Sequence, residues 1–279
     1  MRTRDYVPIA LLGGIAAFIV VQGREMGRTR KARPAAATPA AVDTGVAPAV
    51  QPQGARDANA SRVQPASIDV QRPAELRASD EPAPKRDDFV IRETIRENSS
   101  GTYITAILQQ QDQLLIRWPE RNREALRVWI QRGDLSIPDW NGNYPLMAER
   151  AFDEWKAAGF PLRFDMVTDA VGSDIQIRWT NRFPPSDGLR IGLTNNARDQ
   201  NGWLVTSEIL IATHDHTGAP LTPETVVGVA RHEVGHALGL GHSPSPQDVM
   251  YPESRTSVIS DADRATLNLI YRLPPGVVK

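Results

Sequence analysis

Residues 231–253 read RHEVGHALGLGHSPSPQDVMYPE and place three of the chain's five histidines within eleven residues. His232 and His236 are four residues apart, so on a helix they project from the same face one turn apart. Glu233 lies next to the first histidine and is displaced around such a helix. The spacing predicts two imidazoles that converge on one metal ion, with a carboxylate that can reach a metal-bound water without being a ligand. The alternative is a polar helix face on which the histidines are merely hydrogen-bonded.

The flanking residues set the limits of this helix. Thr222 is a suitable N-cap and Pro223 a suitable first helical residue. Gly239 tolerates a positive φ, so it can end the helix and turn the chain back, which lets His242 supply a third imidazole. Three nitrogen ligands and one open position are what a catalytic zinc ion requires, whereas a structural site is more often closed by a fourth protein ligand.

The composition limits the other possibilities. The 279 residues suffice for one sizeable domain or two small ones, and 32 Lys and Arg balance 33 Asp and Glu. This charge balance does not point to nucleic acid as a partner. Cysteine is absent, which excludes a disulfide framework and a thiol nucleophile, so any metal must be held by His, Asp or Glu.

Residues 1–31 form an expected membrane anchor or signal segment. An uncharged run of 18 residues, 6–23, is flanked by arginines on both sides, and no Ala-x-Ala cleavage site follows. An uncleaved membrane helix is favoured over a buried core helix. The basic residues after the run would favour a cytoplasmic C-terminal part by the positive-inside rule. The chemistry of residues 231–253 instead favours a catalytic domain outside the cytoplasm, or secretion if the segment is cleaved.

Two segments separate this region from the rest of the chain. Residues 32–88 are rich in Pro and Ala with few aromatic residues, a composition that predicts a disordered linker. Residues 89–124 are expected to be a helical lead-in, with an amphipathic helix over 103–117 that ends before Pro119. This helix could pack on the core or act as a pro-segment.

Residues 125–279 alternate between strand-like and helix-like patterns. A helix is predicted over 144–158 and a second begins at Thr222. Five runs have strand character, namely 125–131, 162–167, 174–180, 188–194 and 203–213.

The histidine string is a specific signature. His232, Glu233, His236 and His242, with the intervening Gly239, fit H-E-x-x-H-x-x-G-x-x-H, and Met250 follows as in metzincins. Ser243 directly after the third histidine, the segment 248–252 and the helix expected after Ser260 are similar to those of matrixins. Residues 125–272 therefore resemble a matrixin-type catalytic domain, as in matrix metalloproteinases and their bacterial relatives.

The resemblance implies a fold and an activity. The fold would be α+β: a twisted, mixed five-stranded sheet with an active-site helix, a second long helix and a C-terminal helix. The activity would be a zinc-dependent endopeptidase with Zn2+ held by His232, His236 and His242, Glu233 as general base and Met250 as an apolar floor. An edge strand over 188–194 would pair with a peptide substrate; as an alternative, it is an ordinary edge strand. The residues assigned to this pairing are Leu189, Arg190, Ile191, Gly192 and Leu193.

The chain also departs from the family. Without cysteine, the cysteine-dependent latency of the vertebrate members is excluded, and Pro252-Glu253-Ser254 replaces the Pro-x-Tyr stretch that walls the specificity pocket. His214, Asp215 and His216 could hold an additional zinc or calcium ion, although a solvated turn is the simpler interpretation. The alternative function is a non-catalytic, zinc-containing binding module tethered to the membrane.

Overall fold

The computed structural model describes residues 81–120, 124–253 and 258–279. The expected membrane segment, 1–31, lies outside these residues, as does most of the expected linker. Among the described residues, no helix has the length and apolar character needed to cross a membrane.

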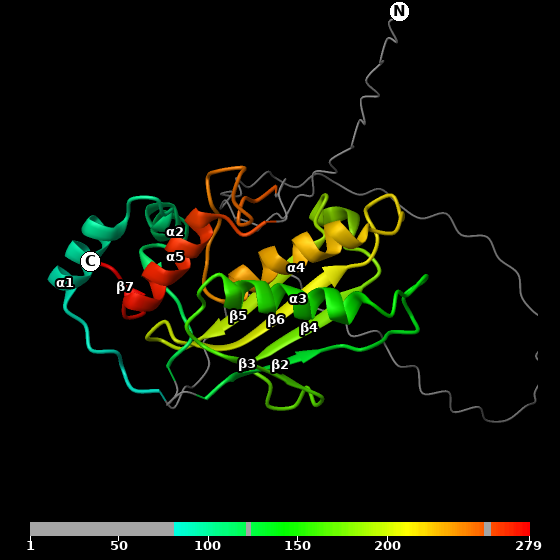
Figure 1. Cartoon of the computed structure of the whole chain (residues 1–279), viewed down its shortest axis with the longest axis horizontal. Coiled ribbons are helices and arrows are strands. Elements are labelled where there is room, and N and C mark those ends of the chain that lie inside the picture. The colour runs from blue at the N-terminus through cyan, green and yellow to red at the C-terminus, as the bar shows by residue number, and fades with distance from the viewer. Residues whose placement is uncertain (1–80, 121–123, 254–257) are drawn as a thin grey trace, which may run out of the picture. The chain divides into compact units, whose positions relative to one another are not determined.

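A five-stranded mixed sheet forms the centre of the fold (Figure 1). Its strand order is β3-β2-β4-β6-β5, with β5 antiparallel to β6 and the other neighbours parallel. The strands are β2 Leu126–Ile130, β3 Phe164–Val167, β4 Ile175–Thr180, β5 Gly192–Arg198 and β6 Leu204–Ala212. The predicted α+β architecture with a mixed five-stranded sheet is confirmed, and its edge strand β5 is antiparallel to β6.

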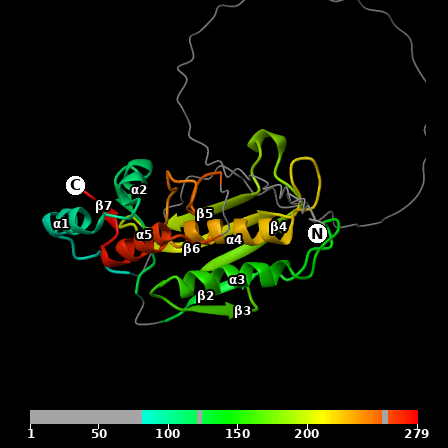
Figure 2. The same ribbon diagram turned by 45° about the horizontal axis from the view of Figure 1, so that its top comes forward.

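Two helices pack on the sheet, α3 Tyr144–Ala157 and α4 Pro223–Ala237. They lie side by side, and α4 contacts β5 and β6 (Figures 1 and 2). The indole of Trp155 on α3 donates to the carbonyl oxygen of Arg231 on α4 at 2.8 Å. Every residue of α4 from Val226 to Ala237 is buried. The helix that carries the histidines is therefore fixed between a sheet and a second helix.

The ends of α4 agree with the sequence prediction. The Thr222 hydroxyl accepts a hydrogen bond from the backbone N–H of Thr225, and Pro223 opens the helix. Beyond the last turn, Gly239 has a φ of +102°, and a β-carbon there would collide with the carbonyl oxygen of Ile116. Both the backbone conformation and the close approach require glycine at this position.

The helix predicted over 103–117 is wrong in its second half. Helix α2 spans only Ile104–Gln110, because Asp112 and Gln113 adopt positive φ values of 50° and 63° and turn the chain. The chain then continues as the short strand β1, Leu114–Leu115, paired with β7, Gly276–Val277. Helix α1, Asp88–Asn98, precedes α2.

The edge strand also differs from its prediction. A 3-10 turn, η1 Pro185–Asp187, and Gly188 at a φ of +68° precede β5, so the strand starts at Gly192 instead of residue 188. The C-terminal helix is α5, Asp261–Arg272. It begins with a capping box in which Ser260 and Asp263 each accept from the other's backbone N–H.

Candidate metal centre and active site

The three histidines converge on one point. The Nε2 atom of His236 lies 3.1 Å from that of His232 and 3.2 Å from that of His242. A tetrahedral zinc ion with Zn–N bonds of about 2.0–2.1 Å holds its nitrogens about 3.3 Å apart. The spacing therefore fits a single ion. In the described part of the chain, these histidines are the one group of His, Asp or Glu side chains arranged to hold a metal.

Backbone carbonyls set the orientation of two of the rings. Nδ1 of His232 lies 2.7 Å from the carbonyl oxygen of Val249, and Nδ1 of His236 lies 2.9 Å from that of Leu240. A carbonyl can only accept, so both Nδ1 atoms carry the proton and both Nε2 atoms present a lone pair to the common point.

Burial keeps the histidines neutral. It lowers the pKa of His236 to about 4 and that of His242 to about 3, with the charge of His236 adding to the effect on His242. The pKa of His232 is also held well below its ordinary value, by burial first and then by the other two histidines. Neutral imidazole is the form that binds a metal, so at neutral pH all three histidines are in the protonation state that metal binding requires.

Glu233 is fully buried beside the histidines. Its Oε2 atom accepts a hydrogen bond from the Thr194 hydroxyl at 2.6 Å, and its Oε1 atom has no hydrogen-bond partner among the described residues. Burial raises the pKa of Glu233 to about 8, while the Thr194 hydrogen bond and the charge of Arg190 act in the opposite direction. A buried carboxyl oxygen without a partner is costly unless another group uses it, and in the deprotonated form of Glu233 this oxygen is a candidate proton acceptor.

The edge strand leaves room for this carboxylate. A β-carbon at Gly192 would collide with Oε1 of Glu233 and would lie 2.8 Å from a methyl group of Val229. Only glycine therefore fits between β5 and this part of α4.

Met250 packs against α4, the helix that carries His232 and His236. Its side chain is fully buried, and its sulfur occupies the place that a β-carbon at Gly235 would need. Its carbonyl oxygen accepts from the backbone N–H of Ser243 at 2.9 Å, which joins the turn to the residue after His242. These contacts place Met250 against α4, and its role as an apolar floor of the metal site stays a prediction.

Further hydrogen bonds hold the turn that orients His232. The carboxylate of Asp263 accepts from the backbone N–H of Val249 at 2.9 Å and from the Tyr103 hydroxyl at 2.9 Å. Because the carbonyl of Val249 accepts from His232, the start of α5 and the segment before α2 both hold the turn that orients this ring.

Only some of the residues assigned to substrate pairing lie in β5. Gly192 and Leu193 lie in the strand, whereas Leu189, Arg190 and Ile191 precede it. The Arg190 guanidinium forms an ion pair with Asp187 at 3.3 Å. Gly192 to Arg198 therefore form the sheet edge, and pairing of this edge with a substrate stays a prediction.

His214 and His216 take no part in this site. Nδ1 of His214 lies 2.9 Å from the hydroxyl of Thr213, and Asp215 accepts from the backbone of Thr217 and Ala219 in a turn. No metal-binding group includes them among the described residues. An additional zinc or calcium ion at this turn finds no support in the geometry.

Thr194 and Gln110 contact the site but are not among the residues predicted from the sequence. Thr194 lies at the last position of the predicted strand, but nothing in its spacing to Glu233 shows that the two meet. Gln110 contacts the backbone of His242 from 132 residues away.

Comparison with known proteins agrees with this geometry. A family model described as Matrixin matches residues 140–272. Metalloendoproteinase 1-MMP of Arabidopsis thaliana is 34% identical over 143 residues, which is 49% of this chain and 39% of the relative. Metalloendoproteinase 5-MMP of the same plant is 30% identical over 158 residues, which is 53% of this chain and 41% of the relative.

The chain thus spans about two fifths of the length of these curated relatives. Both are plant proteins, and kinship with bacterial matrixins stays a prediction. The matched residues 140–272 include the three converging histidines and Glu233, so this part of the chain is similar to a matrixin domain.

Proposed function

We propose that the protein is a zinc-dependent endopeptidase. The observation that supports this proposal most strongly is the convergence of three neutral imidazoles beside a buried carboxylate with one unpartnered oxygen. A structural metal site has no use for such a carboxylate, whereas hydrolysis requires a proton acceptor next to the metal.

The three histidines would hold the ion through their Nε2 atoms. When bound, zinc supplies Lewis acidity that activates water and polarises a peptide carbonyl. Oε1 of Glu233 would accept the proton of the attacking water and later deliver it to the leaving amine. The Thr194 hydroxyl holds the other carboxylate oxygen, so the carboxylate does not need to reorient between the two proton transfers.

The substrate would be an extended peptide. Strand β5 is the last strand of the sheet, and its residues from Gly192 onward lie against the helix that carries the site. An extended chain can add to such an edge through backbone hydrogen bonds, which positions a peptide bond without selecting its sequence. Attachment to the membrane through residues 1–31, with the domain outside the cytoplasm, belongs to the same proposal.

A cleavage assay with a quenched peptide library tests this function. The full chain should cleave peptides internally, lose the activity when a chelator removes its metal, and regain it on addition of zinc. A chain that binds one zinc ion and binds peptides without cleaving them would instead be the non-catalytic binding module.

A further inference from the structure

We infer that Gln110, which lies 30 residues before the matched domain, is a positioning residue for the third histidine. The inference rests on the proposed function only in taking His242 as a metal ligand. Its geometric part concerns the backbone of His242 and stands without any metal.

The contact is a pair of hydrogen bonds between one side chain and one residue. Nε2 of Gln110 donates to the carbonyl oxygen of His242 at 2.9 Å, and the backbone N–H of His242 donates to Oε1 of Gln110 at 2.9 Å. Two bonds in opposite directions fix both the position and the orientation of the residue, as a neighbouring strand would. Gly241 allows this approach, because a β-carbon there would lie 3.1 Å from Oε1 of Gln110.

His242 needs such support more than the other two histidines. His232 and His236 lie on α4, and their Nδ1 atoms are held by the carbonyls of Val249 and Leu240. His242 lies in the loop after the helix, and among the described residues its Nδ1 has no hydrogen-bond partner. The placement of its ring therefore depends on its backbone, which Gln110 holds.

Gln110 is itself on a firmly attached segment. Ile104 and Ile107 of α2 are fully buried, and a β-carbon at Gly241 would lie 3.2 Å from the Cγ1 methylene of Ile107. Just before α2, the backbone N–H of Tyr103 donates to the Thr266 hydroxyl on α5 at 3.0 Å. After it, the indole of Trp118 donates to the carbonyl oxygen of Ala237 at 2.7 Å. Both ends of the segment 103–118 are thus fastened to the metal-site helix or to α5.

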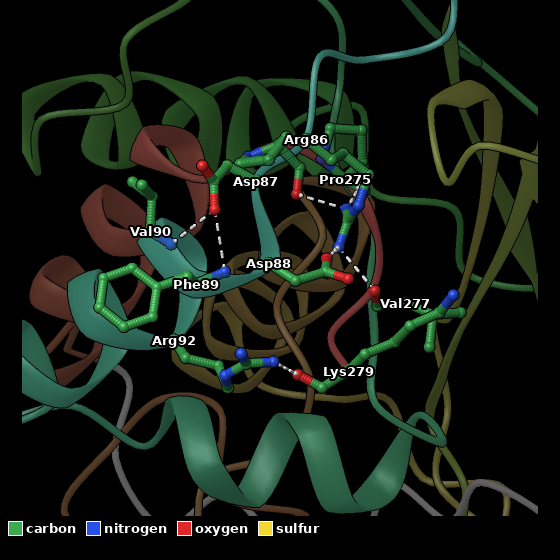
Figure 3. A network of polar contacts seen from close by, with 10 residues as sticks. Arg86, Asp87, Asp88, Phe89, Val90, Arg92, Pro275, Val277 and Lys279 are labelled. Carbon is green, nitrogen blue, oxygen red and sulfur yellow. Dashed lines mark hydrogen bonds and ion pairs between the residues drawn. The ribbon is translucent and has the colours of Figure 1, made fainter.

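The start of the described chain is fastened to its end as well. Figure 3 shows the Arg86 guanidinium donating to the carbonyl oxygens of Pro275 and Val277, and Arg92 reaching the carbonyl oxygen of Lys279. These contacts join the approach to α1 to the C-terminal tail. Removal of residues 81–118 as a pro-segment would take Gln110 away, so the inference places this segment in the zinc-binding form of the protein.

Substitution of Gln110 by methionine tests the inference in the full chain. Gln110→Met keeps the length and packing of the side chain but removes both hydrogen bonds. Gln109→Met, at the exposed neighbouring position of α2, is the matched control. Three quantities are compared: the amide hydrogen-exchange rate of His242 in metal-free protein, the zinc dissociation constant, and the absorption spectrum of the cobalt-substituted protein.

The expected result for Gln110→Met is faster exchange at His242, zinc binding weakened about tenfold, and an altered cobalt spectrum, with Gln109→Met like the wild type. Exchange and zinc affinity both at wild-type values would overturn the inference. Faster exchange with unchanged zinc affinity and spectrum would also overturn it, because the contact would then be structural only. If the wild type itself binds no zinc, the proposed function fails, while the exchange rate still tests the contact.

Discussion

The hydroxyl of Thr194 donates a hydrogen bond to Oε2 of Glu233 at 2.6 Å and lies 3.0 Å from the carbonyl oxygen of the same residue. Thr194 belongs to the edge strand β5, and Glu233 belongs to α4, the helix that carries His232 and His236. Strand β5, which is expected to hold the substrate, is therefore hydrogen-bonded to Glu233, the expected general base. This relationship makes the orientation of the carboxylate dependent on the position of the strand.

Replacement of Thr194 by valine should lower kcat/KM about tenfold. Valine has nearly the same shape but no hydroxyl, and a hydrogen bond to a charged group contributes roughly 1.5–3 kcal/mol. Zinc content should stay the same, because the hydrogen bonds of the Thr194 hydroxyl go to Glu233 and not to a histidine. Steady-state kinetics with a quenched peptide measure the effect, with Thr206→Val on β6 as the control. An unchanged kcat/KM would show that the hydroxyl does not orient Glu233.

Replacement of Gly192 by alanine should reduce both activity and stability. The new β-carbon would meet Oε1 of Glu233 and Val229, and overpacking of this kind costs about 1–3 kcal/mol. Urea unfolding and peptide cleavage measure the two effects. Gly142→Ala, where a β-carbon meets nothing within 4 Å, should leave both at wild-type values. A fully active Gly192→Ala protein would show that the carboxylate does not lie against this strand.

Gly239→Ala should destabilise the protein more than Gly101→Ala. Both glycines have positive φ values, +102° and +73°, and the conformational cost of alanine there is about 1–2 kcal/mol in each case. Only at Gly239 does the added carbon also collide with a backbone oxygen, that of Ile116. Urea unfolding should show the difference, and zinc binding should weaken in Gly239→Ala alone. Equal losses of stability in Gly239→Ala and Gly101→Ala would show that the contact between Gly239 and the carbonyl oxygen of Ile116 does not matter for stability.

The titration of Glu233 predicts a pH-dependent stability for the metal-free protein. Its pKa is about 8 in the folded protein, raised by burial, against 4.5 for the ordinary group. Between these values the folded state binds more protons than the unfolded state, so this group's contribution is complete below pH 4.5 and is lost as the pH rises through about 8.

Glu233→Gln removes this titration and should gain stability relative to the wild type as the pH rises. The gain is on the order of 1 kcal/mol for each pH unit across that window. Urea unfolding of both metal-free proteins at about pH 5 and about pH 8 measures it, and the histidine titrations cancel because the two proteins share them. A stability difference independent of pH would mean that Glu233 is not desolvated.

The metal site could be predicted from the sequence because its spacing is local. His232, Glu233 and His236 lie on one helix, whose period fixes their relative directions, and Gly239 is the kind of residue that turns a chain at a helix end. The capping residues Thr222 and Pro223 gave the start of that helix for the same reason. Such features depend on neighbours within a few residues.

The errors arose where tertiary contacts decide the local structure. Leu115 is buried as it would be on the predicted helix, but it is buried in a strand that pairs with Gly276 at the far end of the chain. Local periodicity does not contain this pairing. The start of β5 was misplaced similarly, because the 3-10 turn before Gly188 ends in a φ of +68° that the apolar pattern of 188–191 does not reveal.

The contacts of Thr194 and Gln110 could not be predicted for a further reason. Each joins the site to an element that is distant in sequence, and neither residue type carries a recognisable spacing to its partner. Threonine in a strand and glutamine at a helix end are both common for unrelated reasons.

The most direct test of the central claim measures zinc content and peptide cleavage on the same samples of wild type, Glu233→Gln and His236→Ala. The account predicts one zinc ion per chain and cleavage for the wild type, and one zinc ion with kcat/KM lower by about a hundredfold or more for Glu233→Gln. For His236→Ala it predicts loss of both zinc and cleavage. Full cleavage by Glu233→Gln, or unchanged zinc content in His236→Ala, would contradict it.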